Sequence, residues 1–557
     1  MQLTGAQIVM ECLIEQGVDT VFGFPGGTIL NIYDALYHKR DQIRHIITAH
    51  EQGAAHAADG YARATGKTGV VFATSGPGAT NLVTGIATAF MDSSPMVAIT
   101  CNVALPLLGR DSFQEVDITG VTMPITKHNY IVKDVAVLAD TIREAFSIAR
   151  SGRPGPVLID IPKDVTAAVT EYSPVAIHDE APACRISERS LGNAMEMIAS
   201  CKKPLIYAGG GVISSGASAE LMEFAHKLHS PVCSSLMGLG GFPASDPLFT
   251  GMIGMHGTAV SSHAANECDL LIAVGTRFSD RVAGNRKKFA HKARILHIDI
   301  DAAEINKNVV SHHHIIGDVK AVLKRLNAGM PAQKHGEWLE QIDAWKKQFN
   351  KPFSGGDADV KPQYLLEQVQ QLAGSDAVIV TDVGQHQMWS AQFCRFDSPR
   401  TFITSGGLGT MGFGLGAALG VKTACPDKRV VLITGDGCFH MNCPELITGV
   451  MHDIPVTVVV MNNRVLGMVR QWQKLFYEKR FSVTTLERKT DYVRLAEAFG
   501  AAGSRIESRA DVVPVLQKAF SQDKITVVDC RISPDENVLP MIPPGATVDD
   551  IIHDIDL

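Results

Sequence analysis

Several features that would place a protein in a specialised class are missing from this 557-residue sequence. Its eleven cysteines are scattered without a CxxC pair, which argues against a disulfide framework or a zinc ribbon and fits a reducing compartment. No apolar run approaches the roughly 18 residues that indicate a membrane span. The first residues, MQLTGAQIVMECLIEQG, have neither the basic start nor the long apolar stretch of a signal peptide. We therefore expect a cytoplasmic protein that does not span a membrane.

An excess of basic charge is also missing. Lys and Arg total 51 against 58 Asp and Glu, and a net charge of -7 leaves no basic footprint for nucleic acid. Short tandem repeats and low-complexity tracts are not found. What remains, 45% apolar and 20% charged residues, is typical of a soluble globular protein. The length predicts three domains, each large enough for its own core.

Two irregular passages divide the chain. The first, VTAAVTEYSPVAIHDEAPA, ends near Ala183, and the second runs from near Asn327 through KKQFNKPFSGGDADVKPQ to Pro362. Each of the three segments alternates short apolar runs with helical patterns, which predicts three parallel-sheet α/β domains. We expect these domains at residues 1-170, 185-330 and 360-545. The first and third segments share strands that end in glycine-rich turns and open into alanine-rich helices.

An aspartate follows one predicted strand, and two asparagines end the next. RVVLIT before Asp436 and VTVVVM before Asn462 and Asn463 are typical of buried parallel strands. Between them we expect a helix with Pro444 in its first turn and Asn442 as its cap. This connection brings both strand ends to one sheet edge, where α/β proteins bind ligands. A carboxylate and an amide carbonyl converging there suit magnesium, which leaves coordination positions for phosphate.

The alternative is that these polar residues only make turns. Their pattern, however, resembles the metal–diphosphate motif of thiamine-diphosphate enzymes, Gly-Asp-Gly followed at an interval by Asn-Asn. The resemblance implies three domains: a pyrimidine-binding domain, a central FAD-type domain and a diphosphate-binding domain. It also implies thiamine diphosphate and Mg²⁺ as cofactors.

The first segment contains a second motif of the same enzymes. HIITAHEQGAAHAADGYARATGK predicts a strand, a turn and a helix with Glu51 in the first helical turn. An isolated glutamate there could simply stabilise the helix dipole. Followed by SGPGATN, it resembles the glutamate segment of thiamine-diphosphate enzymes. The resemblance implies that Glu51 contacts the cofactor's aminopyrimidine ring and favours the imino tautomer that deprotonates C2. It also implies that Glu51 and Asp436 of one site come from different subunits.

Seven further pieces narrow the resemblance. GFPGG, FQE, GRPGPVLIDIPKDV, GMHG, VGQHQMW, GMVRQWQ and PMIPPGA occur in an order similar to that of acetohydroxyacid synthase (biosynthetic acetolactate synthase) catalytic subunits. The resemblance covers about Thr4 to Ala546. It implies a transferase that decarboxylates pyruvate and condenses the hydroxyethyl carbanion with a second pyruvate or with 2-oxobutyrate, the first common step of branched-chain amino-acid biosynthesis. It further implies a homodimer or homotetramer with active sites at subunit interfaces, and a possible regulatory small subunit.

The resemblance assigns roles residue by residue. The residues of catalysis and of the substrate channel would be Glu51, Gly27, Phe113, Gln114 and Lys163, and the acceptor would be recognised by Arg281, Trp472 and Met468. Magnesium would be held by Asp436, Asn463 and the backbone carbonyl of Val465. Other contacts to thiamine diphosphate would come from Pro77, Asn81, Val383, Gly384, Gln385, His386, Gly409, Met411, Gly435, Gly437 and Met468. In this set Gln385 and His386 would contact the diphosphate, and Met411 would hold the cofactor bent. Simpler alternatives remain for four residues: Phe113, Met411 and Trp472 as packing residues, and Lys163 as a surface lysine.

The central segment predicts a dinucleotide site less firmly. LIYAGGGVISSGA has a strand followed by a glycine turn, but Ser214 replaces the third glycine of G-x-G-x-x-G. Asp299 and Asp301 are expected near a strand end, where acids can bind ribose. The resemblance implies an FAD site formed by Arg153, Met255, His256, Gly257, Gly275, Thr276, Arg277, Asp299, Ile300 and Asp318. Because the condensation involves no net redox change, FAD would be structural or vestigial.

Some residues depart from the family pattern. Ser279 stands where the first of two aspartates before Arg281 is usual, Phe24 where tyrosine is common, and Cys101-Asn102 where Gly-Gln is common. The serine weakens the inference of flavin contact only. The histidines at 312–314 are not expected to bind metal, because neighbouring side chains on a strand face opposite sides.

The sequence leaves three competing interpretations of the function: a flavin-free catabolic acetolactate synthase, a pyruvate oxidase, or a non-catalytic thiamine-diphosphate-binding or scaffold protein.

Overall fold

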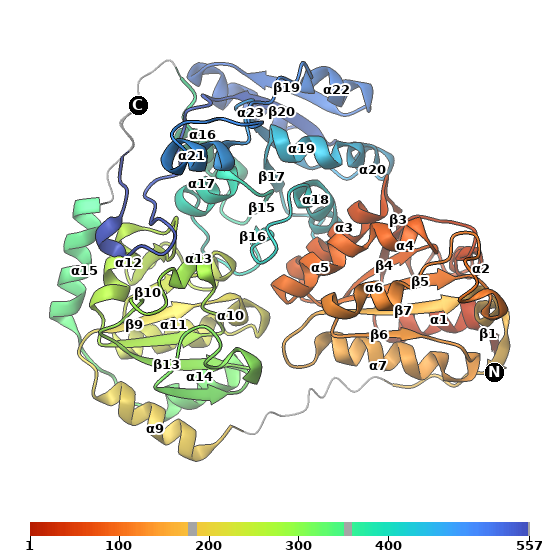
Figure 1. Ribbon diagram of the computed structural model, residues 1–557, viewed down its shortest axis with the longest axis horizontal. Helices are drawn as coiled ribbons and strands as arrows, with labels where there is room; N and C mark the ends of the chain where they lie inside the picture. The colour runs from red at the N-terminus through yellow and green to blue at the C-terminus, as the bar shows by residue number, and fades with distance from the viewer. Residues whose placement is uncertain (177–185, 350–358, 555–557) are drawn as a thin grey trace.

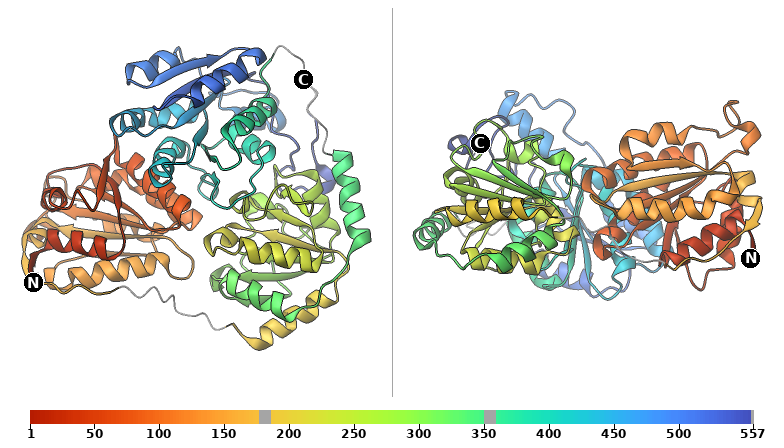
Figure 2. Two further views of the ribbon diagram at one scale, coloured as in Figure 1. Left: turned by 180° about the vertical axis from the view of Figure 1, so that it is seen from behind. Right: turned by 90° about the horizontal axis from the view of Figure 1, so that it is seen from below.

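The computed structural model describes residues 1–176, 186–349 and 359–554. The expected linkers overlap 177–185 and 350–358, which lie outside the described residues. Three six-stranded parallel sheets with flanking helices form three domains, which confirms the predicted fold class (Figure 1). Seen from below, the C-terminal domain lies between the other two (Figure 2). No helix among the described residues is long and apolar enough to cross a membrane.

The first and last sheets have the same strand order. The N-terminal sheet runs β3-β2-β4-β5-β7-β6, built from β2 (Thr20–Gly23), β3 (Arg44–Ile47), β4 (Gly69–Ala73), β5 (Met96–Asn102), β6 (His128–Ile131) and β7 (Pro156–Pro162). The C-terminal sheet runs β16-β15-β17-β18-β20-β19, built from β15 (Val378–Thr381), β16 (Phe402–Ile403), β17 (Val430–Gly435), β18 (Thr457–Asn462), β19 (Ala502–Ile506) and β20 (Thr526–Arg531). Numbered by chain order, both read 2-1-3-4-6-5. Helices that follow corresponding strands therefore occupy corresponding places in the two domains.

The central sheet has a different order, β11-β10-β9-β12-β13-β14. Its strands are β9 (Pro204–Ala208), β10 (Val232–Ser234), β11 (Phe249–Met252), β12 (Leu270–Val274), β13 (Arg294–Asp299) and β14 (His313–Ile316). This is the 3-2-1-4-5-6 order of doubly wound dinucleotide-binding folds, whose ligand crevice lies where the order reverses. Here that point falls between β9 and β12, which are paired in register.

Two glycine-rich helices join the outer domains. α3 (Glu51–Thr65) follows β3, and α18 (Phe413–Ala424) follows β16, so they are equivalent elements. Their backbones touch: a Cβ on Gly60 would lie 2.2 Å from the Ala417 carbonyl oxygen, and one on Gly420 1.9 Å from that of Ala57. One hydrophobic core continues through this contact from the N-terminal into the C-terminal domain.

The end of the chain returns to the central domain. After β20 the tail runs past α12 (Ala259–Glu267), as Figure 1 shows. The Ile542 N–H donates to the Met255 carbonyl at 2.8 Å, and Met541 pairs with Ile552 in an antiparallel bridge. The tail thus covers part of the surface that carries Met255.

Candidate functional site

A cavity of about 80 Å³ opens at the carboxyl edge of the C-terminal sheet. β17 ends at Gly435, β18 runs beside it with Met461 opposite Gly435, and α19 (Asp436–Asn442) begins directly after β17. The structure therefore brings Asp436 and the asparagine pair of the metal–diphosphate motif together, as the parallel connection predicts. The walls include most of the predicted diphosphate-side residues: Val383, Gly384, Gln385, His386, Met411, Gly435, Asp436, Gly437, Asn463, Val465 and Met468.

The connection between the two strands differs from the prediction in one detail. The first helix begins at Asp436 rather than near Pro444, and Pro444 instead lies in a 3-10 turn before α20 (Leu446–Met451). The predicted cap by Asn442 is wrong, because its side-chain amide donates to the Gly412 carbonyl at 2.7 Å. Starting the helix at Asp436 leaves that carboxylate at the helix N-terminus, where negative charge is stabilised.

Asp436 is a buried carboxylate, only 3% exposed, on the wall of this cavity. Burial raises its pKa to about 6, against a smaller lowering effect from Arg488. No ion pair reaches it within the described ranges, and a buried charge without a partner is costly. A divalent cation would supply the missing positive charge. The described residues hold no group of three or more His, Cys, Asp or Glu side chains that could bind a metal ion by themselves. A site with one carboxylate and neutral oxygens is one that magnesium uses.

Asn463 lies across the cavity and is fixed by its neighbours. Its side-chain oxygen accepts the Val465 N–H at 3.1 Å, and its amide nitrogen donates to Gln385 at 3.3 Å. The amide of Gln385 in turn donates to Gln471 and to the Glu536 carbonyl, at 3.1 and 2.8 Å. Asn462 has a different task, because its amide donates to Asp529 of β20 at 2.8 Å. Of the asparagine pair, Asn463 faces the site and Asn462 secures the sheet.

His386 and Met411 complete the cavity wall near the glycines. The His386 ring lies over Gly435, where a Cβ would meet Nδ1 at 3.0 Å. Burial lowers its pKa to about 3, so the ring is neutral, and its Nε2 is buried without a hydrogen-bond partner. An unpaired ring nitrogen in a cavity can bond a ligand's polar group. The Met411 methyl group reaches to 3.6 Å from the Cβ position of Gly437.

The N-terminal domain presents a second cluster around Glu51. Glu51 is the first residue of α3, 8% exposed, and accepts a hydrogen bond from the Asn81 amide at 2.9 Å. Asn81 ends α4 (Pro77–Asn81), so the structure brings together the predicted Glu51, Pro77 and Asn81 segments. The Gln114 backbone lies 2.7 Å from the Cβ position of Gly76, at the base of the same helix. Phe113 beside it is 87% exposed, which excludes a packing role within one chain.

Gly27 and Lys163 complete the predicted channel set. A Cβ on Gly27 would meet nothing within 4 Å, so the space beside it is open. The Lys163 side chain is exposed, while its backbone carbonyl accepts from Asn31 at 3.3 Å. Neither residue lines the cavity that contains Asp436.

Sequence reasoning missed two residues that support these clusters. The Glu445 carboxylate of the C-terminal domain accepts the backbone N–H groups of Ala49 and His50, at 3.1 and 3.0 Å, directly before Glu51. Arg488 donates to the Asp436 carbonyl at 3.1 Å. Only the position of Glu445 after the Gly-Asp-Gly motif could have drawn attention to it. The sequence does not show its partners, because Glu445 and His50 are 395 residues apart in the chain.

Comparison with known proteins decides the family. Three family models match in order: the N-terminal TPP-binding domain of thiamine pyrophosphate enzymes at residues 3–121, the central domain at 191–326 and the C-terminal TPP-binding domain at 382–530. A probable acetolactate synthase large subunit of Methanocaldococcus jannaschii is 46% identical over 99% of this chain and 96% of its own length. The chain belongs to the acetolactate synthase family of thiamine pyrophosphate enzymes. The resemblance seen in the sequence is confirmed.

Bacterial members of the family are equally similar. An acetolactate synthase of Mycobacterium bovis is 47% identical over 99% of this chain and 91% of its own length. The acetolactate synthase large subunit of Haemophilus influenzae is 43% identical over 99% of this chain and 98% of its own length. The similarity thus extends over all three domains in archaeal and bacterial relatives.

Two of the three residues that the resemblance assigns to acceptor recognition, Arg281 and Trp472, lie together in this chain. The Arg281 guanidinium carbon is 6.0 Å from the centre of the Trp472 ring, although the two residues come from different domains. Trp472 lies on α21 (Gly467–Phe476), half-buried, with Phe476 edge-on at 5.6 Å. Arg281 is exposed and pairs weakly with Asp280 at 3.9 Å. Met468, at the start of α21, lines the Asp436 cavity, so this helix connects the two regions.

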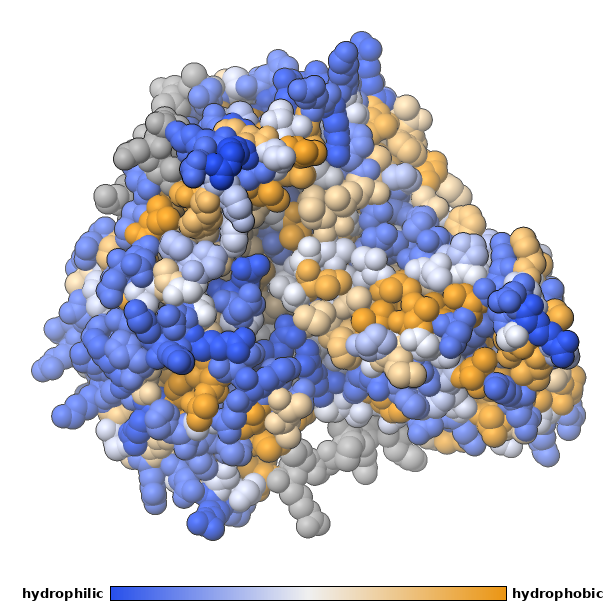
Figure 3. All heavy atoms as spheres, viewed as in Figure 1, coloured by the Kyte–Doolittle hydropathy of each residue, from blue (hydrophilic) through white to orange (hydrophobic). Residues whose placement is uncertain are grey.

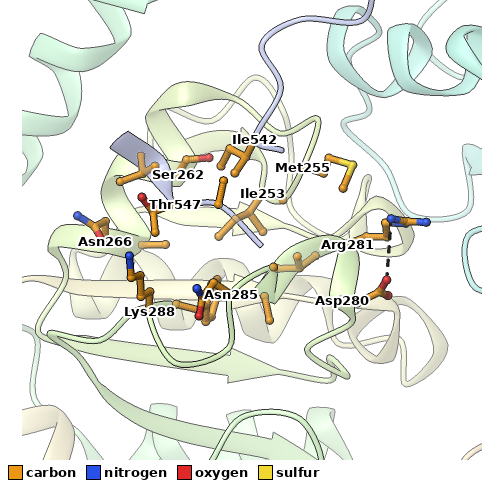
Figure 4. A pocket seen from close by; sticks show the side chains of 18 of the residues that line it. Ile253, Met255, Ser262, Asn266, Asp280, Arg281, Asn285, Lys288, Ile542 and Thr547 are labelled. Carbon is orange, nitrogen blue, oxygen red and sulfur yellow. Dashed lines mark ion pairs between the residues drawn. The ribbon is translucent and has the colours of Figure 1, made fainter. Parts of the chain in front are cut away.

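Arg281 also lies at one end of a cavity of about 70 Å³ in the central domain. Its walls come from residues 253–255, from α12, from residues 280–290 and from the returning tail. Figure 4 shows Asp280 and Arg281 at the opposite end from Asn266 and Lys288, with Met255 near the Arg281 end. The Met255 N–H donates to the Arg281 carbonyl at 2.8 Å. This contact fixes Met255 beside Arg281.

The predicted FAD residues gather at the switch point of the central sheet. Gly209 and Gly211 after β9 approach Gly275 after β12 so closely that a Cβ on Gly211 would lie 2.7 Å from the Gly275 Cα. Asp299 ends β13, and burial raises its pKa to about 6. Arg153 of the N-terminal domain reaches this edge and pairs with Glu304 at 3.0 Å.

The remaining residues of the FAD set lie after β11, β12, β13 and β14. His256 is buried with Nδ1 unpartnered, and the Thr276 carbonyl bonds to His297 at 2.8 Å. Asp318 differs, because its carboxylate accepts the Ala321 N–H as the cap of α14 (Val319–Gly329). The other three residues of the set lie in the loops after β11, β12 and β13, in the order Gly257, Arg277 and Ile300.

Proposed function

We propose that this protein is a thiamine-diphosphate-dependent acetolactate synthase catalytic subunit. It decarboxylates pyruvate and joins the two-carbon unit to a second pyruvate, giving acetolactate, or to 2-oxobutyrate, giving acetohydroxybutyrate. This is the first common step of branched-chain amino-acid biosynthesis. The observation that carries the proposal is the buried, unpaired carboxylate of Asp436 in a cavity with Asn463, in a chain 43–47% identical to acetolactate synthases.

The C-terminal cavity fits a magnesium-bound diphosphate. Asp436, the Asn463 amide oxygen and the Val465 carbonyl would hold Mg²⁺, with Gln385 and His386 beside the diphosphate. Gly409 and Met411 would support the bent cofactor. Thiamine diphosphate, when bound, supplies the nucleophilic carbon and the sink for electrons. Glu51 holds the proton that the aminopyrimidine shares, from its position at the buried start of α3.

Two chains are proposed to build each active site. The residues that line the Asp436 cavity all belong to the C-terminal domain, and Glu51 and Asn81 are not among them. Large apolar side chains lie exposed around both clusters, among them Phe113, Met123 and Met441. Figure 3 shows apolar residues gathered on the face of the N-terminal domain. A homodimer or homotetramer would cover such surfaces. The relatives named large subunits further support a small regulatory partner.

FAD is proposed as a bound but non-redox group of the central domain. Three observations support FAD: the 3-2-1-4-5-6 strand order, the close approach of Gly211 to Gly275 and the buried Asp299 at the strand edge.

The domain limits 1-170, 185-330 and 360-545 are kept as part of the proposal. A cytoplasmic location is proposed because every cysteine of the described ranges is free.

The test is formation of acetolactate from pyruvate by the purified protein. We expect turnover that requires both thiamine diphosphate and magnesium and that needs no external electron acceptor, with yellow flavin retained after purification. Flavin-dependent turnover coupled to an electron acceptor, without acetolactate, would indicate a pyruvate oxidase instead. Cofactor binding without any turnover of pyruvate would indicate a non-catalytic binding protein.

A further inference from the structure

The segment 404–412 links β16 to α18 and carries two of the proposed cofactor contacts. Met411 lies on the wall of the Asp436 cavity, and Gly409 lies 3.8 Å from the Val383 side chain at its Cβ position. The segment belongs to no helix or strand. Side chains from elsewhere must therefore fix its conformation.

One end of the segment is fixed within its own domain. The Asp382 carboxylate, fully buried after β15, accepts the Gly412 and Gly414 N–H groups at 2.8 and 3.3 Å. These bonds set the start of α18. They do not reach residues 404–410.

The other end is held from both domains. Within the C-terminal domain, Gln387 donates to the Thr404 hydroxyl at 2.7 Å and to the Ser405 carbonyl at 3.0 Å. The two glycines that follow are held by the N-terminal domain. α5 (Val83–Asp92) ends in Asp92, whose carboxylate accepts the Gly406 and Gly407 N–H groups at 3.1 and 2.6 Å. Arg63 of α3 pairs with Asp92 at 3.0 Å and donates to the Thr404 carbonyl at 2.6 Å. The fit leaves no room for a side chain, because a Cβ on Gly407 would lie 2.8 Å from the Asp92 oxygen.

A second bond reaches the cofactor-contacting residues directly. The Thr88 hydroxyl, one turn before Asp92, lies 2.7 Å from the Thr410 hydroxyl, and both are buried. The Thr410 N–H donates to the Ser405 hydroxyl at 3.1 Å, which closes the segment on itself. Thr410 stands between Gly409 and Met411, so its position determines theirs.

We propose that Thr88 and Asp92 are positioning residues for the cofactor, acting from the N-terminal domain through the segment 404–411 of the same chain. The inference rests on the proposed function, because Gly409 and Met411 matter only if they hold the bent cofactor. It adds a role that the motifs do not assign. The N-terminal domain would then serve two active sites, one in the partner subunit through Glu51 and one in its own chain through Thr88 and Asp92.

The contact is better suited to position the segment than to hold the domains together. The outer domains are already joined by the backbone contact of α3 with α18 and by the apolar core that runs through it. The single hydrogen bond between the hydroxyls of Thr88 and Thr410 adds little to the stability of this domain contact. The same bond is well placed to determine where Met411 lies.

The test uses Thr88→Val, which keeps the side chain's shape and removes its hydroxyl, in the full-length holoenzyme. The measurement is the exchange rate of the C2 proton of bound thiamine diphosphate, which requires the bent cofactor. We expect exchange to slow about 10-fold, the effect of one lost buried hydrogen bond. The thermal unfolding midpoint should change no more than in the control.

The matched control is Thr122→Val. Thr122, the last residue of α6 (Ile118–Thr122), is buried like Thr88. It donates to the carbonyl four residues before it, Ile118, at 2.7 Å, as Thr88 donates to Thr84 at 2.8 Å. It makes no bond to the C-terminal domain among those recorded for its hydroxyl. The control should exchange like the unmodified enzyme.

A reciprocal variant, Thr410→Val, removes the other half of the bond. It should slow exchange to a similar extent, and the double variant should be little worse than either single one, because both remove one interaction. An active unmodified enzyme with wild-type exchange in Thr88→Val and Thr410→Val would overturn this inference and leave the proposed function intact. An unmodified protein that neither binds thiamine diphosphate nor turns over pyruvate would overturn both.

Discussion

At the residue scale, the buried carboxylate of Asp436 lowers the stability of the metal-free protein and favours binding of a cation. Burial raises its pKa to about 6 from the ordinary 3.8, so the folded protein binds a proton more readily than the unfolded chain does. Its contribution to stability is present at low pH and is lost as the pH rises through about 6. At neutral pH the metal-free fold therefore contains a carboxylate that only a cation compensates.

Because the raised pKa of Asp436 lowers stability at neutral pH, we predict that Asp436→Asn stabilises the metal-free protein. In metal-free protein at pH 7 the variant should unfold at a higher temperature than the unmodified chain, by the equivalent of about 1–3 kcal/mol. The difference should shrink as the pH falls toward about 5, because the native carboxyl then binds a proton. Magnesium-dependent binding of thiamine diphosphate should be lost in the same variant. Calorimetry and cofactor titration at both pH values check this, and a variant less stable than the unmodified protein at pH 7 would contradict it.

Glu51 makes a contrasting residue-scale prediction. In Glu51→Gln the size of the side chain and the hydrogen bond from Asn81 can persist, so binding of thiamine diphosphate should change little. C2-proton exchange should fall by about 10²–10⁴-fold, because an amide cannot share the proton. Exchange of the bound cofactor, followed by nuclear magnetic resonance, is the measurement. A rate equal to that of the unmodified enzyme would end the assigned role.

At the element scale, the contact of α3 with α18 depends on glycine. Gly420→Ala would force a methyl group to 1.9 Å from the Ala57 carbonyl oxygen, and both partners are backbone in packed helices. We expect a loss of about 3 kcal/mol or more, or failure to accumulate as soluble protein. The matched control is Gly192→Ala in α9 (Glu188–Ala199), where a Cβ meets nothing within 4 Å and a gain of about 0.4–1 kcal/mol is expected. Similar unfolding midpoints for the two variants would refute the packing argument.

α21 carries the element-scale prediction about specificity. If Trp472 beside Arg281 forms the pocket for the acceptor's alkyl group, it favours 2-oxobutyrate over pyruvate by burying one methylene, which is worth about 10–200-fold. Trp472→Leu should flatten this preference while pyruvate self-condensation survives. The ratio of acetohydroxybutyrate to acetolactate from mixed substrates measures it, with Lys474→Ala on the same helix as control. An unchanged ratio in an active variant would make Trp472 a packing residue.

The strands and helices around Asp436 show which parts of the fold could be predicted from the sequence. Asp436 and Asn463 could be brought together by reasoning alone, because a parallel strand–helix–strand unit places both strand ends at one edge. The strand order of the central sheet and the repetition of one topology in the outer sheets needed the structure. The start of α19 was misplaced because proline suits a first turn wherever a turn begins, and here a 3-10 turn separates two helices.

Contacts between domains could not be predicted. Glu445 with Ala49 and His50, Thr88 with Thr410, and Arg281 with Trp472 are set by how three separately folded sheets pack. No local pattern records such partners, since the hydroxyls of Thr88 and Thr410 are 322 residues apart in the chain. Family resemblance supplied the acceptor residues but not the supports behind Glu51 and Met411.

At the scale of the whole molecule, the proposed active site uses Glu51 of one chain and Asp436 of another. The cavity around Asp436 is lined by the C-terminal domain alone, and the Glu51 cluster lies in a different domain. Under the proposed function, the two clusters of one chain serve different sites. Assembly is then a condition of catalysis rather than an addition to it.

The most direct measurement mixes two inactive proteins. Glu51→Gln and Asp436→Ala are each expected to be nearly inactive in acetolactate formation. The two are co-expressed with different tags so that the mixed dimer can be purified. If each site combines two chains, one of the two sites of every mixed dimer has both native residues, and the purified mixed dimer regains about half of the unmodified activity. If each site lies within one chain, every site of the mixed dimer keeps one defect. Recovered activity is the result we predict, and a mixed dimer as inactive as its parents would contradict the account.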